Sequence, residues 1–201
     1  MTSRGRPRDT TLDDAIDAAT ESVLLQDGYP AISIDRIARM AGTTRAAVYR
    51  RVRSPSDLVV RVIIGRFGLD PAPNHGDLRT DLRRLQQLQR EFFADPVARA
   101  ALAGLLSDLR TDEVRAAQFY EQFIAPRRTS VAAMLDRASA RGEIADVEQP
   151  ELVSDLLTGP LLLRTVMPAI GTIDDDLIEA TVEAALNHCR ARGARPDEFR
   201  R

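Results

Sequence analysis

The segment Ser33–Val52 reads SIDRIARMAGTTRAAVYRRV, and a single glycine, Gly42, separates its two short amphipathic stretches. From Arg36 to Arg53 the chain contains six arginines and no acidic residue, although its net charge is −2. A helix, a tight turn at a glycine and a second helix with a basic face are the parts of a helix-turn-helix that enters a DNA major groove. The segment therefore predicts a DNA-binding motif.

The two helices of this motif have N-cap residues at their predicted starts. Ser33 precedes an apolar face that begins at Ile34, and Thr44 precedes the second helix. Serine and threonine are favoured at such positions because the side-chain oxygen accepts a hydrogen bond from a free N–H of the first turn. Ala47 and Val48 are expected to face inward. The outward residues of the second helix are then Arg45, Ala46, Tyr49 and Arg50.

Apolar residues recur at helical spacing along most of the rest of the chain, and no strand-like alternation is found. We therefore predict an all-α fold of about nine helices, in which an N-terminal three-helix domain is followed by a C-terminal helical domain. Pro126 is expected to kink or split a long helix between Asp112 and Arg141, because proline lacks the N–H that a helix interior needs.

The composition narrows the class of protein. With 201 residues, 44% of them hydrophobic, the chain can bury a substantial core. The start, MTSRGRPRDT, lacks the apolar region of a signal peptide, so we expect a cytoplasmic location. The single cysteine, Cys189, and the two histidines show no metal-ligand spacing, and no glycine-rich phosphate loop is found. We accordingly predict no enzyme activity, no cofactor and no metal.

In the order and spacing of these elements the chain resembles the tetracycline-repressor (TetR) family of bacterial regulators. The match is densest between Arg8 and Val60, in Asp27-Gly28-Tyr29, Ile32-Ser33-Ile34-Asp35-Arg36-Ile37-Ala38, Ala41-Gly42 and Val48-Tyr49-Arg50-Arg51. Further on, Arg141-Gly142-Glu143-Ile144 and Gly159-Pro160-Leu161-Leu162 resemble one C-terminal subgroup of that family. The resemblance implies a homodimer with a DNA-binding domain, a connecting helix and a domain for an effector and for dimerisation. The corresponding ranges are 1–8 for a flexible basic arm, 9–54 for DNA binding, 55–70 for the connecting helix, 71–194 for effector binding and dimerisation, and 195–201 for a polar tail.

The resemblance also assigns residues that contact DNA. Arg45 and Arg50 are each able to donate to O6 and N7 of a guanine, and the Tyr49 hydroxyl is suited to a phosphate. Alternatively these side chains belong to an ordinary solvated helix surface. The full predicted set is Ser33, Thr43, Thr44, Arg45, Ala46, Tyr49, Arg50, Arg53, Arg4 and Arg6.

Two positions depart from the family pattern within this region. Val52 occupies a position where the family has an aromatic residue, and Pro55 one where the family has a lysine that contacts a phosphate. Arg53 is the neighbouring side chain able to replace that lysine. In the N-terminal arm, Arg4 and Arg6 are suited to a narrow minor groove, where the negative potential attracts arginine. The alternative for this arm is a disordered solubilising tail.

For the C-terminal domain the residue types leave two interpretations open. Aromatic and apolar side chains there either form an effector pocket or only complete the core, and the leucine-rich faces either form a dimer interface or serve the same core. The predicted ligand-binding residues are Phe92, Phe93, Leu105, Phe119, Tyr120, Phe123 and Met134. The predicted dimer-interface residues are Leu152, Leu156, Leu163, Ile178, Val182 and Leu186.

The sequence thus predicts a DNA-binding transcriptional regulator. We expect a homodimeric repressor that binds a palindromic double-stranded DNA operator and is released by a small-molecule effector, with no membrane partner. One alternative is a helical protein-interaction regulator whose DNA binding is vestigial. The other is a helical small-molecule enzyme that acts through carboxylates alone.

Overall fold

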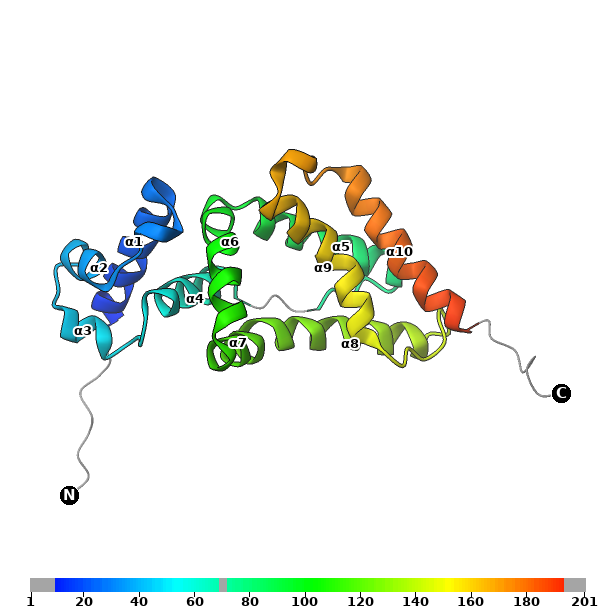
Figure 1. Ribbon diagram of the computed structural model, residues 1–201. Coiled ribbons are helices and arrows are strands. Elements are labelled where there is room, and N and C mark those ends of the chain that lie inside the picture. Colours follow the sequence, from blue (N-terminus) through cyan, green and yellow to red (C-terminus); the bar gives the residue numbers. More distant parts are fainter. Residues whose placement is uncertain (1–9, 69–71, 194–201) are drawn as a thin grey trace, which may run out of the picture. The chain divides into compact units, whose positions relative to one another are not determined.

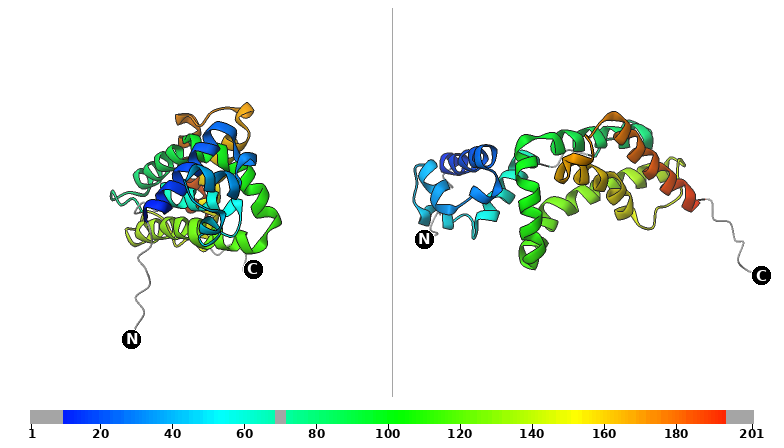
Figure 2. Two further views of the ribbon diagram at one scale, coloured as in Figure 1. Left: turned by 90° about the vertical axis from the view of Figure 1, so that its left-hand side faces the viewer. Right: turned by 45° about the horizontal axis from the view of Figure 1, so that its top comes forward.

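The structure is a computed structural model that describes residues 10–68 and 72–193, and within these ranges it is all-α, without strands (Figures 1 and 2). The α-helices are α1 (Thr10–Asp27), α2 (Ile34–Met40), α3 (Arg45–Tyr49), α4 (Pro55–Arg66), α5 (Leu78–Ala94), α6 (Pro96–Thr111), α7 (Glu113–Phe119), α8 (Ala125–Ala140), α9 (Pro150–Val166) and α10 (Asp175–Gly193). Short 3₁₀ turns occupy Tyr29–Ala31 and Pro168–Ile170. None of the helices in the described ranges is long and apolar enough to cross a membrane.

The helical segment between Asp112 and Arg141 is not split at Pro126, and its hydrogen-bond pattern changes just before this residue instead. Residues Tyr120–Ile124 form a π-helical turn that joins α7 to α8 without a break in the chain's helical path. Because the ring of Pro126 would clash with the carbonyl four residues earlier, the wider turn relieves that contact. If α7, this turn and α8 are counted as one helix, the described chain has nine helices, as expected.

The structure divides into two compact units, and the chain passes from one to the other after residue 67, within α6 after residue 99, and after residue 113. The first unit comprises residues 10–67 and 100–113, and the second comprises the remaining described residues. This division follows from packing alone, so the roles that we assign to residues 9–54, 55–70 and 71–194 stay predictions. The predicted basic arm, residues 1–8, and the predicted polar tail, residues 195–201, lie outside the described residues.

The first unit is built around the buried face of α1. Ile16 and Val23 of α1 are completely buried, as are Ile37 of α2 and Val48 of α3. The start of α4 is fixed by a capping box, in which the Ser54 hydroxyl accepts a hydrogen bond from the backbone N–H of Asp57 and the Asp57 carboxylate accepts one from the N–H of Ser54. The buried residues pack α2 against α1 and α3 against α2.

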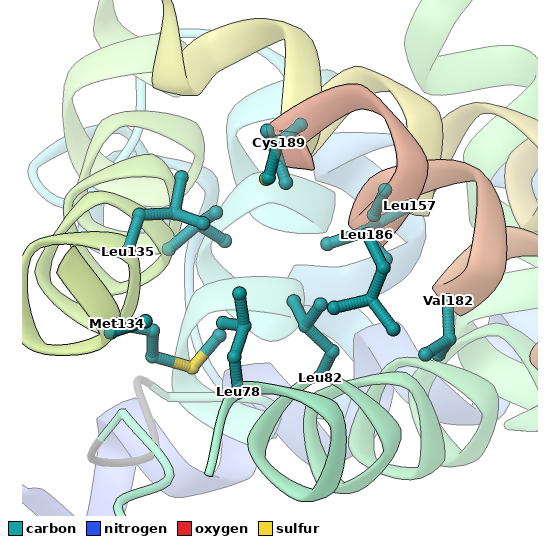
Figure 3. Packing of buried hydrophobic residues seen from close by; sticks show 12 residues of the cluster. Leu78, Leu82, Met134, Leu135, Leu157, Val182, Leu186 and Cys189 are labelled. Carbon is teal, nitrogen blue, oxygen red and sulfur yellow. The ribbon is translucent and has the colours of Figure 1, made fainter. Parts of the chain in front are cut away.

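In the second unit, α5, α8, α9 and α10 pack around a common apolar core. The close-up shows side chains from all four helices pointing toward one another (Figure 3). The labelled residues are Leu78 and Leu82 of α5, Met134 and Leu135 of α8, Leu157 of α9, and Val182, Leu186 and Cys189 of α10. Burial raises the pKa of the Cys189 thiol, so this cysteine is a core residue of low reactivity.

Candidate nucleic-acid interface

The helix-turn-helix forms where the sequence predicts it. The Ser33 hydroxyl accepts a hydrogen bond from the N–H of Arg36 at 3.3 Å, and the Thr44 hydroxyl accepts one from the N–H of Ala47 at 3.2 Å. Between the two helices, Gly42 has φ +64°, a left-handed conformation that residues with a Cβ rarely adopt. The helix α3 is shorter than predicted, because it ends at Tyr49 and Arg50 is its C-cap.

The inner and outer faces of α3 are as predicted. Ala47 and Val48 are buried, with exposed fractions of 5% and 0%. The predicted DNA-binding residues that remain solvent-exposed on this motif are Ser33, Thr44, Arg45, Ala46, Tyr49, Arg50 and Arg53, and Thr43 is half-buried. The other two members of the set, Arg4 and Arg6, lie outside the described residues. No DNA contact of any of these residues is tested by the fold, so their role stays a prediction.

Acidic residues divide the six arginines of the motif into two groups. Arg36 pairs with Asp27, Arg51 pairs with Asp13, and the Nε of Arg45 lies 2.6 Å from Oδ1 of Asp35. The sequence did not indicate the first two pairs, since both acids lie on α1, outside the acid-free run. Among described residues, no side-chain partner is found for the other three arginines. These are Arg39, Arg50 and Arg53.

The pair of Arg51 and Asp13 belongs to a wider acidic face on α1. Both side chains are mostly buried, and Arg51 also donates to the carbonyl of Ala47 at 3.0 Å. Further along α1, Asp17 accepts two hydrogen bonds from Arg61 of α4, which raise the pKa of that guanidinium. Arg51 and Arg61 therefore hold the segment after α3 and the helix α4 on α1.

A further contact in the first unit joins α6 to the end of α1. The Tyr29 hydroxyl donates to Oδ2 of Asp108 at 2.7 Å. The Tyr29 ring lies so close to Gly104 that a Cβ added there would be 2.3 Å from Cδ1 of the ring. This contact has no local sequence signal apart from a glycine in the middle of a helix.

The structure does not bring the predicted ligand-binding residues together in one place. Four phenylalanines gather in the second unit, where the ring centroids of Phe92 and Phe123 are 5.6 Å apart and those of Phe119 and Phe123 are 5.0 Å apart. The ring centroids of Phe92 and Phe93 are 4.8 Å apart. Tyr120, in the π-helical turn, is exposed. Met134 lies instead in the four-helix core, and Leu105 is buried in the first unit.

Arg127 ties this aromatic cluster to the chain that follows α4. Its guanidinium lies 3.6 Å from the centroid of the Phe123 ring, and Nη1 donates to the carbonyl of Phe123 at 2.8 Å. Its Nη2 donates to the carbonyl of Gly68, the residue after the C-cap of α4. Arg127 thus links Phe123 of the aromatic cluster to Gly68.

The predicted interface residues fall into an exposed and a buried group. Leu152, Leu156 and Leu163 of α9 have exposed fractions of 38%, 36% and 48%. The α10 residues Ile178, Val182 and Leu186 are at most 4% exposed, and the last two belong to the core of the second unit. These three α10 side chains are therefore too deeply buried to contact a second subunit in this arrangement. The interface prediction rests on the exposed leucines of α9.

Comparisons with known proteins agree over nearly the whole chain. A family model described as "Bacterial regulatory proteins, tetR family" matches residues 16–62, and one described as "Tetracyclin repressor-like, C-terminal domain" matches residues 72–185. An uncharacterized HTH-type transcriptional regulator of Mycobacterium tuberculosis is 32% identical over 165 residues, which cover 81% of this chain and 78% of the relative.

Other similar proteins are more distant but cover more of the chain. The DNA-binding transcriptional repressor TetR of Mycobacteroides abscessus is 27% identical over 198 residues, covering 97% of this chain and all of the relative. Among solved structures, the TetR family transcription regulator SCO0332 has a TM-score of 0.68 at 23% identity and covers 88% of this chain and 97% of its own. The regulator FadR from Bacillus subtilis, in complex with stearoyl-CoA, has a TM-score of 0.64 at 15% identity, with coverages of 88% and 98%.

Proposed function

Because this chain belongs to the TetR family of bacterial regulatory proteins, and is therefore a DNA-binding transcriptional regulator, we propose that it is a homodimeric repressor released from its operator by a small molecule. The observation that carries the proposal is the α2–turn–α3 motif. Its outward face combines Arg45, Tyr49 and Arg50, while Ala47 and Val48 fix the motif to the core. The proposed site of action is the cytoplasm.

The exposed leucines of α9 support the dimer. Leu152, Leu156 and Leu163 are spaced by four and seven residues, so they lie along one side of the helix. A two-fold interface would use the same face of both subunits. In such a dimer the two α3 helices would contact half-sites about 34–36 Å apart, which predicts a palindromic operator.

The phenylalanine cluster supports an effector with a large apolar part. Small-molecule sites are lined mainly by apolar and aromatic side chains with a few polar groups, and Tyr120 and Gln122 lie exposed on the adjoining π-helical turn. The related fold of Bacillus subtilis FadR holds stearoyl-CoA, which supports a ligand for this fold without defining its identity here. π-helical turns also occur frequently at functional sites.

Arg127 gives the effector a route to the connecting helix α4. Since its guanidinium lies on Phe123 and donates to the carbonyl of Gly68, a ligand that displaces Phe123 would disturb the hydrogen bond to Gly68, the residue after the C-cap of α4. A ligand shifts a conformational equilibrium only by its different affinity for the two states. We propose that the effector favours the state in which α4 no longer presents both α3 helices to one operator.

Operator binding tests the proposal. The double variant Arg45→Ala with Arg50→Ala should lose sequence-specific binding to the intergenic DNA beside the protein's own gene, measured by fluorescence anisotropy with nonspecific competitor. The dimer should stay intact in sedimentation. Arg84→Ala with Arg99→Ala removes the same charge from exposed arginines of the second unit and is the matched control. Unchanged operator binding by the first variant would refute the assigned interface.

A further inference from the structure

A carboxylate on the DNA-binding motif needs an explanation, because phosphates repel it. Asp35 is the second residue of α2, and 54% of its side chain is exposed. Its partner Arg45, the first residue of α3, is 63% exposed, and the two groups meet at Nε and Oδ1, 2.6 Å apart. An ion pair between side chains this exposed contributes about 0–1 kcal/mol to stability, so the fold does not depend on it.

The three acid-paired arginines of the motif differ in which helices their ion pairs connect. Arg36 and Arg51 pair with Asp27 and Asp13 of α1, and the second of these pairs is largely buried. The Arg45 pair instead joins α2 to α3 at the outer surface of the motif. No described acid other than Asp35 pairs with Arg45, and the contact closest to the carboxylate is at Nε. The terminal nitrogens, Nη1 and Nη2, are therefore left for an outside acceptor.

We propose that Asp35 is a positioning residue that orients Arg45 so that its guanidinium donates to O6 and N7 of one guanine in each operator half-site. The proposal rests on the proposed function, because Arg45 must lie in the major groove. A phosphate is bound by a positive charge in many orientations, whereas a bidentate hydrogen bond to a base needs a planar guanidinium in one orientation. Fixing the side chain before binding reduces the entropy lost on binding.

The contrast with Arg50 and Arg53 fits this assignment. Neither side chain has a partner among described residues, so both suit phosphates, for which charge matters more than orientation. The negative charge of Asp35 weakens the attraction of the motif to DNA of any sequence, and the orientation that it gives Arg45 increases the selectivity for one sequence. Asp35 therefore acts on specificity through Arg45, and it is not itself a contact residue.

The test compares base preference with overall affinity. The selected operator and a panel of its single-base-pair variants are titrated with the wild type, Asp35→Asn and Asp35→Glu. The wild type should prefer guanine at one symmetric position by about 5- to 160-fold, the range that one bidentate contact supplies. Asp35→Asn should lose at least fivefold of this preference and bind scrambled DNA as well as the wild type or better. Asp35→Glu, which keeps the carboxylate, should retain most of the preference.

Asp27→Asn is the matched control, because it removes the same charge from another exposed carboxylate paired with an arginine of the motif. It should leave the preference at that position unchanged. A full preference in Asp35→Asn would overturn the proposal. So would an Arg45→Ala variant that weakens binding equally on all sequences and lowers the salt slope by about one, since that is the behaviour of a phosphate contact. A wild type that binds no operator would refute the proposed function and this inference together.

Discussion

At the scale of single residues, the contact between Tyr29 and Gly104 has the least tolerance for change. An added Cβ at Gly104 would lie 2.3 Å from the Tyr29 ring and 2.9 Å from its Cβ, so the ring would have to move as a whole. We expect Gly104→Ala to lower the free energy of unfolding by about 1–3 kcal/mol, as overpacked sites do. Urea denaturation measures this change.

Gly65 is the matched control for this prediction. It lies exposed in α4, and a Cβ added there would have no neighbouring atom within 4 Å, so Gly65→Ala should stabilise the protein by up to about 1 kcal/mol through helix propensity alone. If Gly104→Ala were equally stabilising, the Tyr29 ring would be free to turn away, and the contact with α6 would not be specific.

The sequence predicts those features of the site that depend on near neighbours. The caps at Ser33 and Thr44, the left-handed Gly42 and the buried Ala47 and Val48 all follow from positions a few residues apart, and all are confirmed. The acids that neutralise Arg36 and Arg51 are 9 and 38 residues away along the chain. Which arginines of the motif are paired with α1 is therefore fixed by tertiary packing and cannot be predicted from composition.

At the scale of elements, α5 and α10 are joined along their exposed sides by three ion pairs. Arg79 pairs with Glu183, Arg83 with Glu179, and Arg90 with Asp175. The pairs run in opposite order along the two helices, as expected for antiparallel neighbours. The hydrogen bond from Arg79 lowers the pKa of Glu183 below its usual value.

This lowered pKa predicts the sign of a pH effect. A carboxylate with a lower pKa in the folded chain stabilises the fold above its unfolded pKa, about 4.3 for glutamate, and loses that contribution as the pH falls through its folded pKa. Glu183→Gln should therefore lower the melting temperature slightly at pH 7, and the difference should close below about pH 4.

Calorimetry of the wild type and variant across this pH range measures the effect. Glu91→Gln, at an exposed position of α5 without a described side-chain partner, is the control and should show no such dependence. A Glu183→Gln difference that persists unchanged at pH 3 would mean that the ion pair is not its source.

Element boundaries show where local signals are enough. Asp77 and Ser54 begin α5 and α4 as N-caps, and Pro126 marks the π-helical turn. Pro160, by contrast, lies inside α9 without ending it. Five residues of that helix are buried on both sides of this proline, so packing compensates for the lost backbone hydrogen bond, which a propensity rule does not consider. These are Val153, Ser154, Leu157, Leu161 and Thr165.

At the scale of the whole molecule, the exposed side of α9 predicts how the protein assembles. Leu156→Glu should convert a dimer to a monomer in analytical ultracentrifugation. The same variant should bind the operator about 100-fold more weakly or worse, because two half-sites held by one dimer gain that much through effective concentration. Leu25→Glu places the same charge on an exposed leucine of α1 and should leave the dimer intact.

A monomeric wild type would contradict the α9 interface at once. A dimeric Leu156→Glu variant would show that Leu156 does not belong to the dimer interface.

The all-α class and the order of the helices could be predicted because both follow from periodicity and turn residues. The assignment of α6 to one of the two units could not be predicted from the sequence. Most of α6 belongs to the first unit, although its first turn belongs to the second. A domain prediction made from the sequence assigns contiguous ranges of residues. The one local signal was Gly104, because a glycine inside a helix lowers helix stability and is kept where a neighbouring group comes close.

The discontinuous first unit limits how recombination can combine halves of such regulators. A chimera joined once, after residue 67, would keep Tyr29 but exchange Gly104 and Asp108 for whatever a foreign α6 carries. The graft would then leave the tyrosine hydroxyl without its acceptor and set the ring against a side chain of the wrong size. A functional hybrid needs three crossovers, after residues 67, 99 and 113, so that residues 100–113 come from the same parent as the helix-turn-helix.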